Sequence, residues 1–378
     1  MKKLVTTSGV ARKFLLPFLF IITPFFVSCS NDDSWSDQNT IIESQPGAKQ
    51  GLYILNEGNY QQNNSSLSYF DFDTADFFKD YFTKTNPNQG GLGDTGNDLK
   101  IYKDKMYAVI NNSNYVEVMD AKTAKHIGKI TVPNCRYITF DGDYAFVSSY
   151  ASDTLNGPGY VAKIDINNGT IVNEVSVGRN PEEMTIVNNK LYVANSGGYY
   201  FPDYDTTVSV IDLNSFTKIY DIEVGKNLHR IRKDKNNHIW VTSRGDYGNF
   251  KPLVAVIDPS TDEIINKLDI AISDLTFYNE KIYFYGSEYT SGKTLTNYGI
   301  INVDTQKIIS SELIKDGTKS EIMAPYGIIA DPKDGSFFIA DAMDFVSDGK
   351  IYYFSKNGNL KWWKSTGISP GHFAIVIK

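Results

Sequence analysis

The sequence contains very little cysteine, and this excludes a fold held together by disulfides. Only two cysteines occur in 378 residues, Cys29 and Cys135. Cys29 lies at the end of an apolar N-terminal segment, where we expect it to be modified. Cys135 is then left without a partner, so the mature chain can form no internal disulfide. Stability must come from the burial of apolar side chains.

Basic residues are also few relative to acidic ones. The chain has 37 Lys and Arg against 44 Asp and Glu, a net charge of −7 at pH 7, and no basic stripe. Nucleic-acid binding depends on clustered positive charge, so we expect no nucleic acid as a partner. Charged residues make up only 21% of the chain, which indicates a globular protein and not a disordered one.

The N-terminus combines positive charge with a short apolar run. Lys2, Lys3, Arg12 and Lys13 precede the segment FLLPFLFIITPFFVSC, which ends at Cys29. This order, with a small residue before the cysteine, is typical of an export signal and not of a membrane span. The junction resembles a bacterial lipobox, in which the cysteine is acylated, although the third residue before it is Phe and not the usual Leu. An ordinary signal peptide with an incidental cysteine is the alternative.

The segment after Cys29 is polar and rich in turn-forming residues, as a flexible tether would be. Its first residues, SNDD, resemble the surface-export signal of lipoproteins in Bacteroides-like bacteria. We therefore expect a signal peptide at 1–28, a lipidated Cys29 with a tether at 29–50, and a folded domain at 51–378. The predicted location is the outer membrane, lipid-anchored and exposed at the cell surface.

One seven-residue pattern with an aromatic third residue recurs seven times in the predicted domain. The aromatics are separated by 39 residues (107 to 146) to 55 residues (283 to 338), which indicates a repeat architecture. The copies are GLYILNE (51–57), KMYAVIN (105–111), YAFVSSY (144–150), KLYVANS (190–196), HIWVTSR (238–244), KIYFYGS (281–287) and SFFIADA (336–342).

A second pattern, an apolar run that ends in Asp, follows each copy of the first. Turn-forming residues come next, and a short Asp side chain that accepts backbone N–H bonds in a turn explains the recurrence. We interpret these aspartates as structural, not as catalytic groups or metal ligands. They are Asp71, Asp120, Asp165, Asp212, Asp258 and Asp304, with Ser355 in the seventh copy.

Each repeat also has a first strand, such as PEEMTIV (181–187), and a fourth, such as NEVSVG (173–178). Four short strands per repeat are the signature of a β-propeller blade. The first repeat lacks a first strand, whereas the chain finishes with PGHFAIVI (370–377), a first strand without a successor. The sequence therefore predicts an all-β, seven-bladed β-propeller of four-stranded antiparallel blades, closed by the C-terminal strand joining the N-terminal blade.

The two faces of such a propeller differ in composition. The 2–3 loops and the 4–1 connections share one face, here called the loop face; the 1–2 and 3–4 turns share the other, the turn face. The 1–2 turns are short and charged, whereas one 2–3 loop alone, NSGGYYFPDYDTT (195–207), holds four aromatics. The aromatics in or beside the 2–3 loops are Tyr60, Tyr115, Tyr150, Tyr199, Tyr200, Phe201, Tyr204, Tyr247, Phe250, Tyr289 and Phe345.

An aromatic rim with nearby Arg, Asn and His side chains suits a ligand that has a flat apolar surface and polar edges. The alternative is that the long loops merely pack on one another. On loop geometry, the candidate ligand-binding residues are Tyr60, Tyr115, Arg136, Tyr150, Arg179, Asn180, Tyr199, Arg230, Arg244, Tyr289, Tyr326 and His372.

Several of these phrases carry a family resemblance. The repeated strand and Asp-turn phrases resemble the YncE-like seven-bladed propellers over nearly all of 51–378. The segments CSNDD, GLYILNEGNYQQNNSSLSYFD and PGHFAIVI are similar to those of BtuG-like surface lipoproteins. That resemblance implies capture of cobalamin or another corrinoid, without catalysis or a cofactor, and transfer to a TonB-dependent, BtuB-type outer-membrane transporter. Tyr, Asn and Arg suit a macrocycle edged with amides and one phosphodiester.

An enzyme is the main alternative, and a glycan- or protein-binding surface is another. A metal-dependent, lactonase-like hydrolase would use oxygen ligands, for which Glu57, Asn97, Glu182 and Asp274 are candidates without any fixed spacing. His229 and His372 could then act as acid and base. Asp203 and Asp205 leave a weak metal role open, although no EF-hand spacing occurs. With only four Trp, the tryptophan-rich motifs of quinoprotein dehydrogenases are missing.

Overall fold

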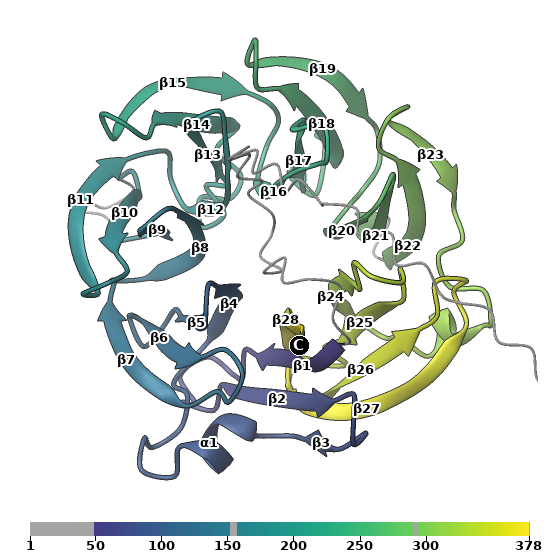
Figure 1. Ribbon diagram of the computed structural model, residues 1–378. Helices are drawn as coiled ribbons and strands as arrows, with labels where there is room; N and C mark the ends of the chain where they lie inside the picture. Colours follow the sequence, from purple (N-terminus) through teal and green to yellow (C-terminus); the bar gives the residue numbers. More distant parts are fainter. Residues whose placement is uncertain (1–48, 152–156, 291–292, 378) are drawn as a thin grey trace, which may run out of the picture. The chain divides into compact units, whose positions relative to one another are not determined.

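The computed structural model describes residues 49–151, 157–290 and 293–377. These form seven four-stranded antiparallel sheets, arranged as blades around a common axis (Figure 1). The predicted all-β, seven-bladed propeller is confirmed. Within these ranges, no helix is long and apolar enough to cross a membrane. The predicted signal peptide, Cys29 and most of the tether fall in 1–48, outside the described residues.

In blades 2 to 7 the strands follow chain order from the axis outward, whereas blade 1 takes its innermost strand from the end of the chain. Blade 1 contains β28 (Pro370–Ile377), β1 (Lys49–Asn56), β2 (Ser66–Asp71) and β3 (Phe77–Phe78); blade 2 contains β4 (Gly96–Tyr102), β5 (Lys105–Ile110), β6 (Tyr115–Asp120) and β7 (His126–Thr131). Blade 3 contains β8 (Cys135–Asp141), β9 (Tyr144–Ser149), β10 (Tyr160–Asp165) and β11 (Thr170–Ser176); blade 4 contains β12 (Pro181–Val187), β13 (Lys190–Asn195), β14 (Thr207–Asp212) and β15 (Thr217–Glu223).

The remaining three blades follow the same order. Blade 5 contains β16 (Leu228–Lys233), β17 (Ile239–Ser243), β18 (Leu253–Asp258) and β19 (Glu263–Leu268); blade 6 contains β20 (Asp274–Tyr278), β21 (Lys281–Thr290), β22 (Lys293–Asn302) and β23 (Lys307–Ser310). Blade 7 contains β24 (Pro325–Ala330), β25 (Phe337–Asp341), β26 (Asp348–Phe354) and β27 (Leu360–Ile368). A five-residue helix, α1 (Tyr81–Thr85), and a 3₁₀ turn, η1 (Thr318–Ser320), lie in connections between blades. The periodicity of the sequence did not indicate either, because each is too short to repeat an apolar face.

The ring closes as predicted. Strand β28 pairs antiparallel with β1 from Lys49 opposite Ile377 to Asn56 opposite Pro370 (Figure 1). Ala374 and Val376 of β28 pack with Tyr53 of β1 in one buried cluster. The closure therefore combines backbone hydrogen bonds with apolar packing, and it removes two open sheet edges.

The aromatic third residues of the repeat form the packing between blades. All seven are almost fully buried: Tyr53, Tyr107, Phe146, Tyr192, Trp240, Tyr283 and Phe338. Burying one such side chain contributes about 1.5–3 kcal/mol. These aromatics are thus part of the core and are not available to a ligand.

The structural role predicted for the recurring aspartates is confirmed for five of the six. Asp71, for example, accepts backbone N–H bonds from Asp73 at 2.8 Å and Thr74 at 3.1 Å. Asp120, Asp165, Asp212 and Asp258 accept equivalent bonds in their own turns.

Asp304 is the exception. Strand β22 ends two residues earlier, and Asn302 accepts the turn bond from Thr305 N–H at 2.8 Å. Asp304 instead binds Lys235 and Asn236 of the preceding blade. The prediction took Asp304 as the turn residue because most other repeats have Asp at the end of this run. The strand in fact ends at Asn302, two residues earlier.

Candidate functional site

Six of the seven innermost strands are irregular where they meet the loop face. In β12 the pairing passes from Pro181 to Met184, which leaves Glu182 and Glu183 outside the ladder. A regular strand sends successive side chains to opposite faces, whereas a bulge re-aims them. The residues passed over in this way are Asn97, Arg136, Tyr137, Glu182, Glu183, His229, Arg230, Tyr326 and Gly371.

Glu182 organises one side of the axis at the loop face. Tyr150 donates a short hydrogen bond to its carboxylate, and Arg136 donates one at 3.4 Å. The Arg136 guanidinium also lies 4.5 Å from the centre of the Tyr150 ring. Arg244 reaches the same carboxylate only at 3.9 Å. We call these residues together the mouth: Arg136, Tyr150, Glu182 and Arg244 on this side, and Glu57, His229, Tyr326 and His372.

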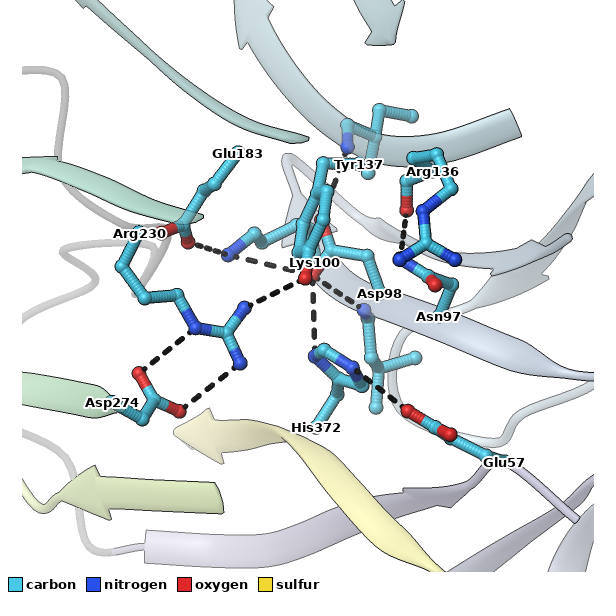
Figure 2. A network of polar contacts seen from close by, with 12 residues as sticks. Glu57, Asn97, Asp98, Lys100, Arg136, Tyr137, Glu183, Arg230, Asp274 and His372 are labelled. Carbon is cyan, nitrogen blue, oxygen red and sulfur yellow. Dashed lines mark hydrogen bonds and ion pairs between the residues drawn. The ribbon is translucent and has the colours of Figure 1, made fainter. Parts of the chain in front are cut away.

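Glu57 organises the other side of the mouth. Tyr326 donates a hydrogen bond to its carboxylate at 3.1 Å, and His372 Nε2 lies 4.0 Å away (Figure 2). Burial raises the pKa of Glu57 to about 7, against the lowering effects of Tyr326 and Arg136. Burial also holds the pKa of His372 well below its ordinary value, and nearby cations such as Arg230 add to the effect. At neutral pH the mouth therefore holds a half-ionised carboxyl beside a neutral imidazole.

Beneath the mouth lies a group of ion-paired side chains from the innermost strands, which we call the belt: Glu183, Arg230, Arg232 and Asp274. Figure 2 shows the pair between Arg230 and Asp274. Arg232 binds Glu183 at 2.9 Å and Asp274 at 2.9 Å, and Arg230 binds Asp274 at 3.3 Å. Burial alone would raise the pKa of Glu183, but Arg232, Arg230 and Lys100 outweigh it and lower the pKa. Each charge of the belt is compensated by another, as buried charges require.

Tyr137 joins the belt to His229. Arg230 donates to the Tyr137 oxygen at 3.1 Å, and His229 Nε2 lies 3.2 Å from the same oxygen. Burial raises the pKa of Tyr137 and lowers that of His229, so the phenol keeps its proton and the imidazole is neutral. The phenol and Nε2 thus share one hydrogen bond. The buried Nδ1 of His229 has no hydrogen-bond partner among the described protein groups.

The exposed aromatics gather on the loop face, as predicted. Tyr199, for instance, is 72% exposed. Among the described residues, one strongly exposed aromatic, Tyr144, lies at a turn-face hairpin, and two, Tyr220 and Trp363, lie on outermost strands. Those on the loop face are Tyr60, Tyr199, Phe201, Tyr247, Phe250, Tyr289 and Phe345.

Other loop aromatics pack on the protein itself. Tyr204 is buried between Phe201 and Tyr247, with ring centres 6.1 Å and 6.3 Å away. Tyr115 donates to the Leu92 carbonyl at 2.8 Å and packs against the core. Some loop aromatics thus pack on the protein and support the loops, whereas others point outward and are accessible to a ligand. Each of the two interpretations of the loop aromatics therefore applies to some of the residues.

A pocket of about 210 Å³ opens beside the mouth, between blades 5 and 6. Its aromatic walls are Tyr247, Phe250 and Tyr289, and Arg244 provides a guanidinium. Ser243, Lys251, Ser273, Ser287 and Glu288 are among its other lining residues. We call this cavity the Arg244 pocket.

Comparison with known proteins places this arrangement in a family. Residues 50–339 match a family described as a domain of unknown function, DUF5074. The chain belongs to the DUF5074 family. No curated protein sequence matches it.

Solved structures that resemble this DUF5074 chain are propellers of diverse kinds. A hypothetical selenium-binding protein from Sulfolobus tokodaii has a TM-score of 0.63 at 10% identity, over 86% of this chain and 93% of its own. Kuenenia stuttgartiensis hydrazine synthase has a TM-score of 0.60 at 17% identity, and the match covers 75% of this chain and 95% of that one. A quinonprotein alcohol dehydrogenase-like protein from Bacteroides thetaiotaomicron has a TM-score of 0.57 at 15% identity, and the match covers 86% of this chain and 78% of that one. At these identities the likeness shows the fold alone.

The twelve candidate residues of this DUF5074 propeller fall into groups. Arg136, Tyr150, Arg244, Tyr326 and His372 converge on the mouth. Three others, Tyr60, Tyr199 and Tyr289, extend into solvent on the same face.

The other four have structural partners. Arg179 is bound by Asp203 and Asp205, and Asn180 Oδ1 accepts the Tyr199 N–H at 3.0 Å, so both hold the 195–207 loop in place. Tyr115 belongs to the core and Arg230 to the belt. The Tyr115 hydroxyl and the Arg230 guanidinium are thus engaged with groups of the protein itself.

The candidate residues omit most of the belt and two of the three aromatic walls of the Arg244 pocket. Tyr137, Glu183 and Arg232 were not among them, nor were Tyr247 and Phe250. A signal for the belt was present: two consecutive polar residues open several predicted first strands, as in EE (182–183) and HR (229–230). Such pairs indicate a bulge, because a regular buried strand has no room for both.

The turn face also has a cavity, which its short, charged 1–2 turns did not indicate. This larger cavity, about 540 Å³, lies along the axis on that side of the belt. Its walls include the small inward residues Thr139, Thr185 and Thr276, and it reaches turn residues such as Asn279 and Glu280. Short threonine side chains leave the axis wider here than at the belt.

The oxygen ligands suggested for a hydrolase have partners of their own. Asp274 lies in the belt, and Asn97 donates to the Arg136 carbonyl at 2.5 Å. Asp203 and Asp205 bind Arg179. Among the described residues, no group of three His, Cys, Asp or Glu side chains is arranged to hold a metal ion.

Proposed function

We propose that this protein captures a corrinoid such as cobalamin on its loop face. The observation that carries the proposal is the gathering of exposed aromatics around a mouth with Arg136 and Arg244. A corrin ring has apolar surface that Tyr and Phe can cover, and its amides and phosphodiester suit guanidinium and phenol groups. The resemblance of residues 51–71 and 370–377 to BtuG-like lipoproteins supports the same ligand.

The two histidines of the mouth are poorly suited to act as the acid and base of a hydrolase. His229 and His372 are both held neutral, with pKa values far below 6.5. A general base works best with a pKa near the working pH, which neither histidine has. The ionised residues beneath them are engaged with one another in the belt.

The test of this proposal uses colour. The purified chain is mixed with cyanocobalamin and passed through a desalting column, and we expect red colour to travel with the protein. Tyr199→Ala and Arg244→Ala should each weaken binding, whereas Tyr144→Ala on the turn face should not. A colourless protein across several corrinoids would exclude capture and leave glycans, which are colourless, as the next ligands to test.

We further propose that the protein is anchored by a lipid on Cys29 and passes its ligand to a TonB-dependent, BtuB-type transporter of the outer membrane. Labelling with a fatty acid should mark the wild type and not Cys29→Ser. Protease added to intact cells should remove the wild type if it faces outward. A transporter that fails to co-purify with the lipidated protein would argue against the transfer step.

A further inference from the structure

The Arg244 pocket has features of a subsite for one part of a ligand. Its volume of about 210 Å³ is below the ~300–1,000 Å³ of pockets that enclose a whole drug-sized molecule. It therefore suits a single ring system and a substituent, while the rest of a larger ligand lies over the mouth.

The guanidinium in this pocket has no strong partner. Of the five arginines among the described residues, Arg136, Arg179, Arg230 and Arg232 each donate side-chain hydrogen bonds. Arg244 has only a 3.9 Å ion pair, to a Glu182 carboxylate that Tyr150 and Arg136 already occupy. Its side chain is 35% exposed. A guanidinium in this state is available to bind an oxyanion through two N–H groups.

The other lining residues favour the same kind of group. Lys251 and Glu288 form an ion pair at 3.0 Å and neutralise each other, so the charge of Arg244 gives the pocket lining a net positive charge. The whole chain carries −7, so this positive site is a local exception. Tyr247, Phe250 and Tyr289 offer ring faces on which a flat base can stack.

The loop that carries two of these rings is held in one shape. Asp246 accepts N–H bonds from Gly248 at 3.0 Å and Phe250 at 2.8 Å. Gly245 has a φ of +69°, and a Cβ there would lie 2.1 Å from the Phe250 carbonyl oxygen. Only glycine fits that position, so the rings are preorganised before a ligand arrives.

We infer that the Arg244 pocket binds an aromatic base that carries a phosphate group. Arg244 pairs with the phosphate, and the base stacks among Tyr247, Phe250 and Tyr289. This rests on the proposed function in one respect: in a corrinoid, the matching group is the nucleotide arm, with its base and phosphodiester. The pocket would then make the protein prefer complete corrinoids to those that lack the arm.

The test compares two corrinoids in the full chain, purified in detergent and free of phosphate buffer. Calorimetry measures binding of cyanocobalamin, which has the nucleotide arm, and of dicyanocobinamide, which lacks it. We expect the wild type to bind cyanocobalamin at least tenfold more tightly. Arg244→Met should weaken cyanocobalamin binding by about 10- to 100-fold, as loss of a charge-assisted hydrogen bond does, and change cobinamide binding less than twofold. Lys103→Met removes the same charge from the turn face and should change neither.

Equal affinities for the two corrinoids in the wild type, or an equal loss of both in Arg244→Met, would overturn the inference and leave corrinoid capture standing. If Arg244→Met does not fold, Tyr289→Leu, which removes a stacking ring, replaces it with the same criteria. If neither corrinoid binds, binding of phenyl phosphate is measured instead. Binding to the wild type but not to Arg244→Met would support the inference that the pocket binds an aromatic group with a phosphate, while the proposal of corrinoid capture fails. If phenyl phosphate does not bind either, both the inference and the proposal are overturned.

Discussion

Glu57 is the residue of the mouth whose charge changes near neutral pH. Its pKa in the folded protein is about 7, above the ordinary value of 4.5, because burial disfavours the carboxylate. Between these two values the folded chain keeps a proton that the unfolded chain has released. The stability contributed by protonated Glu57 is therefore complete below pH 4.5 and is lost as the pH rises through 7.

This gives a prediction for Glu57→Gln. The amide stays neutral and can still accept the hydrogen bond from Tyr326. We expect the variant to match the wild type in melting temperature at pH 4 and to exceed it by about 2–4 °C at pH 8. Thermal unfolding across this range measures the difference, with exposed Glu280→Gln as control. Parallel curves for Glu57→Gln and the wild type would show that Glu57 does not titrate there.

Arg232 provides a second prediction, because it bridges two buried carboxylates of the belt. Arg232→Met leaves Glu183 and Asp274 without their shared partner. We expect a loss of about 3–5 kcal/mol in the free energy of unfolding, as for other broken buried ion pairs. Urea unfolding measures it. Lys103→Met, which breaks the exposed pair with Asp143, should cost at most about 1 kcal/mol; equal costs for the two variants would contradict the buried role of the belt.

At the scale of the elements, hydrogen bonds within the loop 244–251 hold two aromatic rings of the Arg244 pocket in place. Asp246→Ala removes the acceptor of the Gly248 and Phe250 N–H groups. We expect cyanocobalamin binding to weaken about tenfold, because the aromatic rings must then be ordered on binding, while the melting temperature changes little. Asp246→Asn keeps an acceptor oxygen and should retain most of the affinity. Unchanged binding in Asp246→Ala would show that the ligand lies elsewhere on the face.

The innermost strands show what the sequence could and could not predict. The aromatic third residues and the lone C-terminal strand follow from local pattern, so the blades and their closure were predictable. Arg136 and Arg230 look alike in sequence, each near the start of a first strand. Arg136 is the second residue of β8 and reaches the mouth, whereas Arg230 is the third residue of β16 and lies in the belt. That one-residue difference depends on the bulges, which neighbouring strands determine together.

At the scale of the whole molecule, β28 is the single strand that joins the two ends of the folded domain. A chain that stops at Ser369 should lose the ladder to β1 and the buried Ala374, Ile375 and Val376. We expect this chain to aggregate or to be degraded rapidly by protease, since β1 becomes an exposed apolar edge. Gel filtration and limited proteolysis measure both effects. A chain lacking only Lys378 is the control, and equal behaviour of the two would show that closure is dispensable.

The closure also sets an order of events during synthesis. Every other blade is built from four consecutive strands, so each can form soon after the ribosome has made it. Blade 1 begins with strands made first and must wait for the strand made last. The ring is thus completed only after β28 has been made, through contacts that span almost the whole domain, and such distant contacts form slowly. The folding propeller therefore has a built-in delay that ends when β28 pairs with β1.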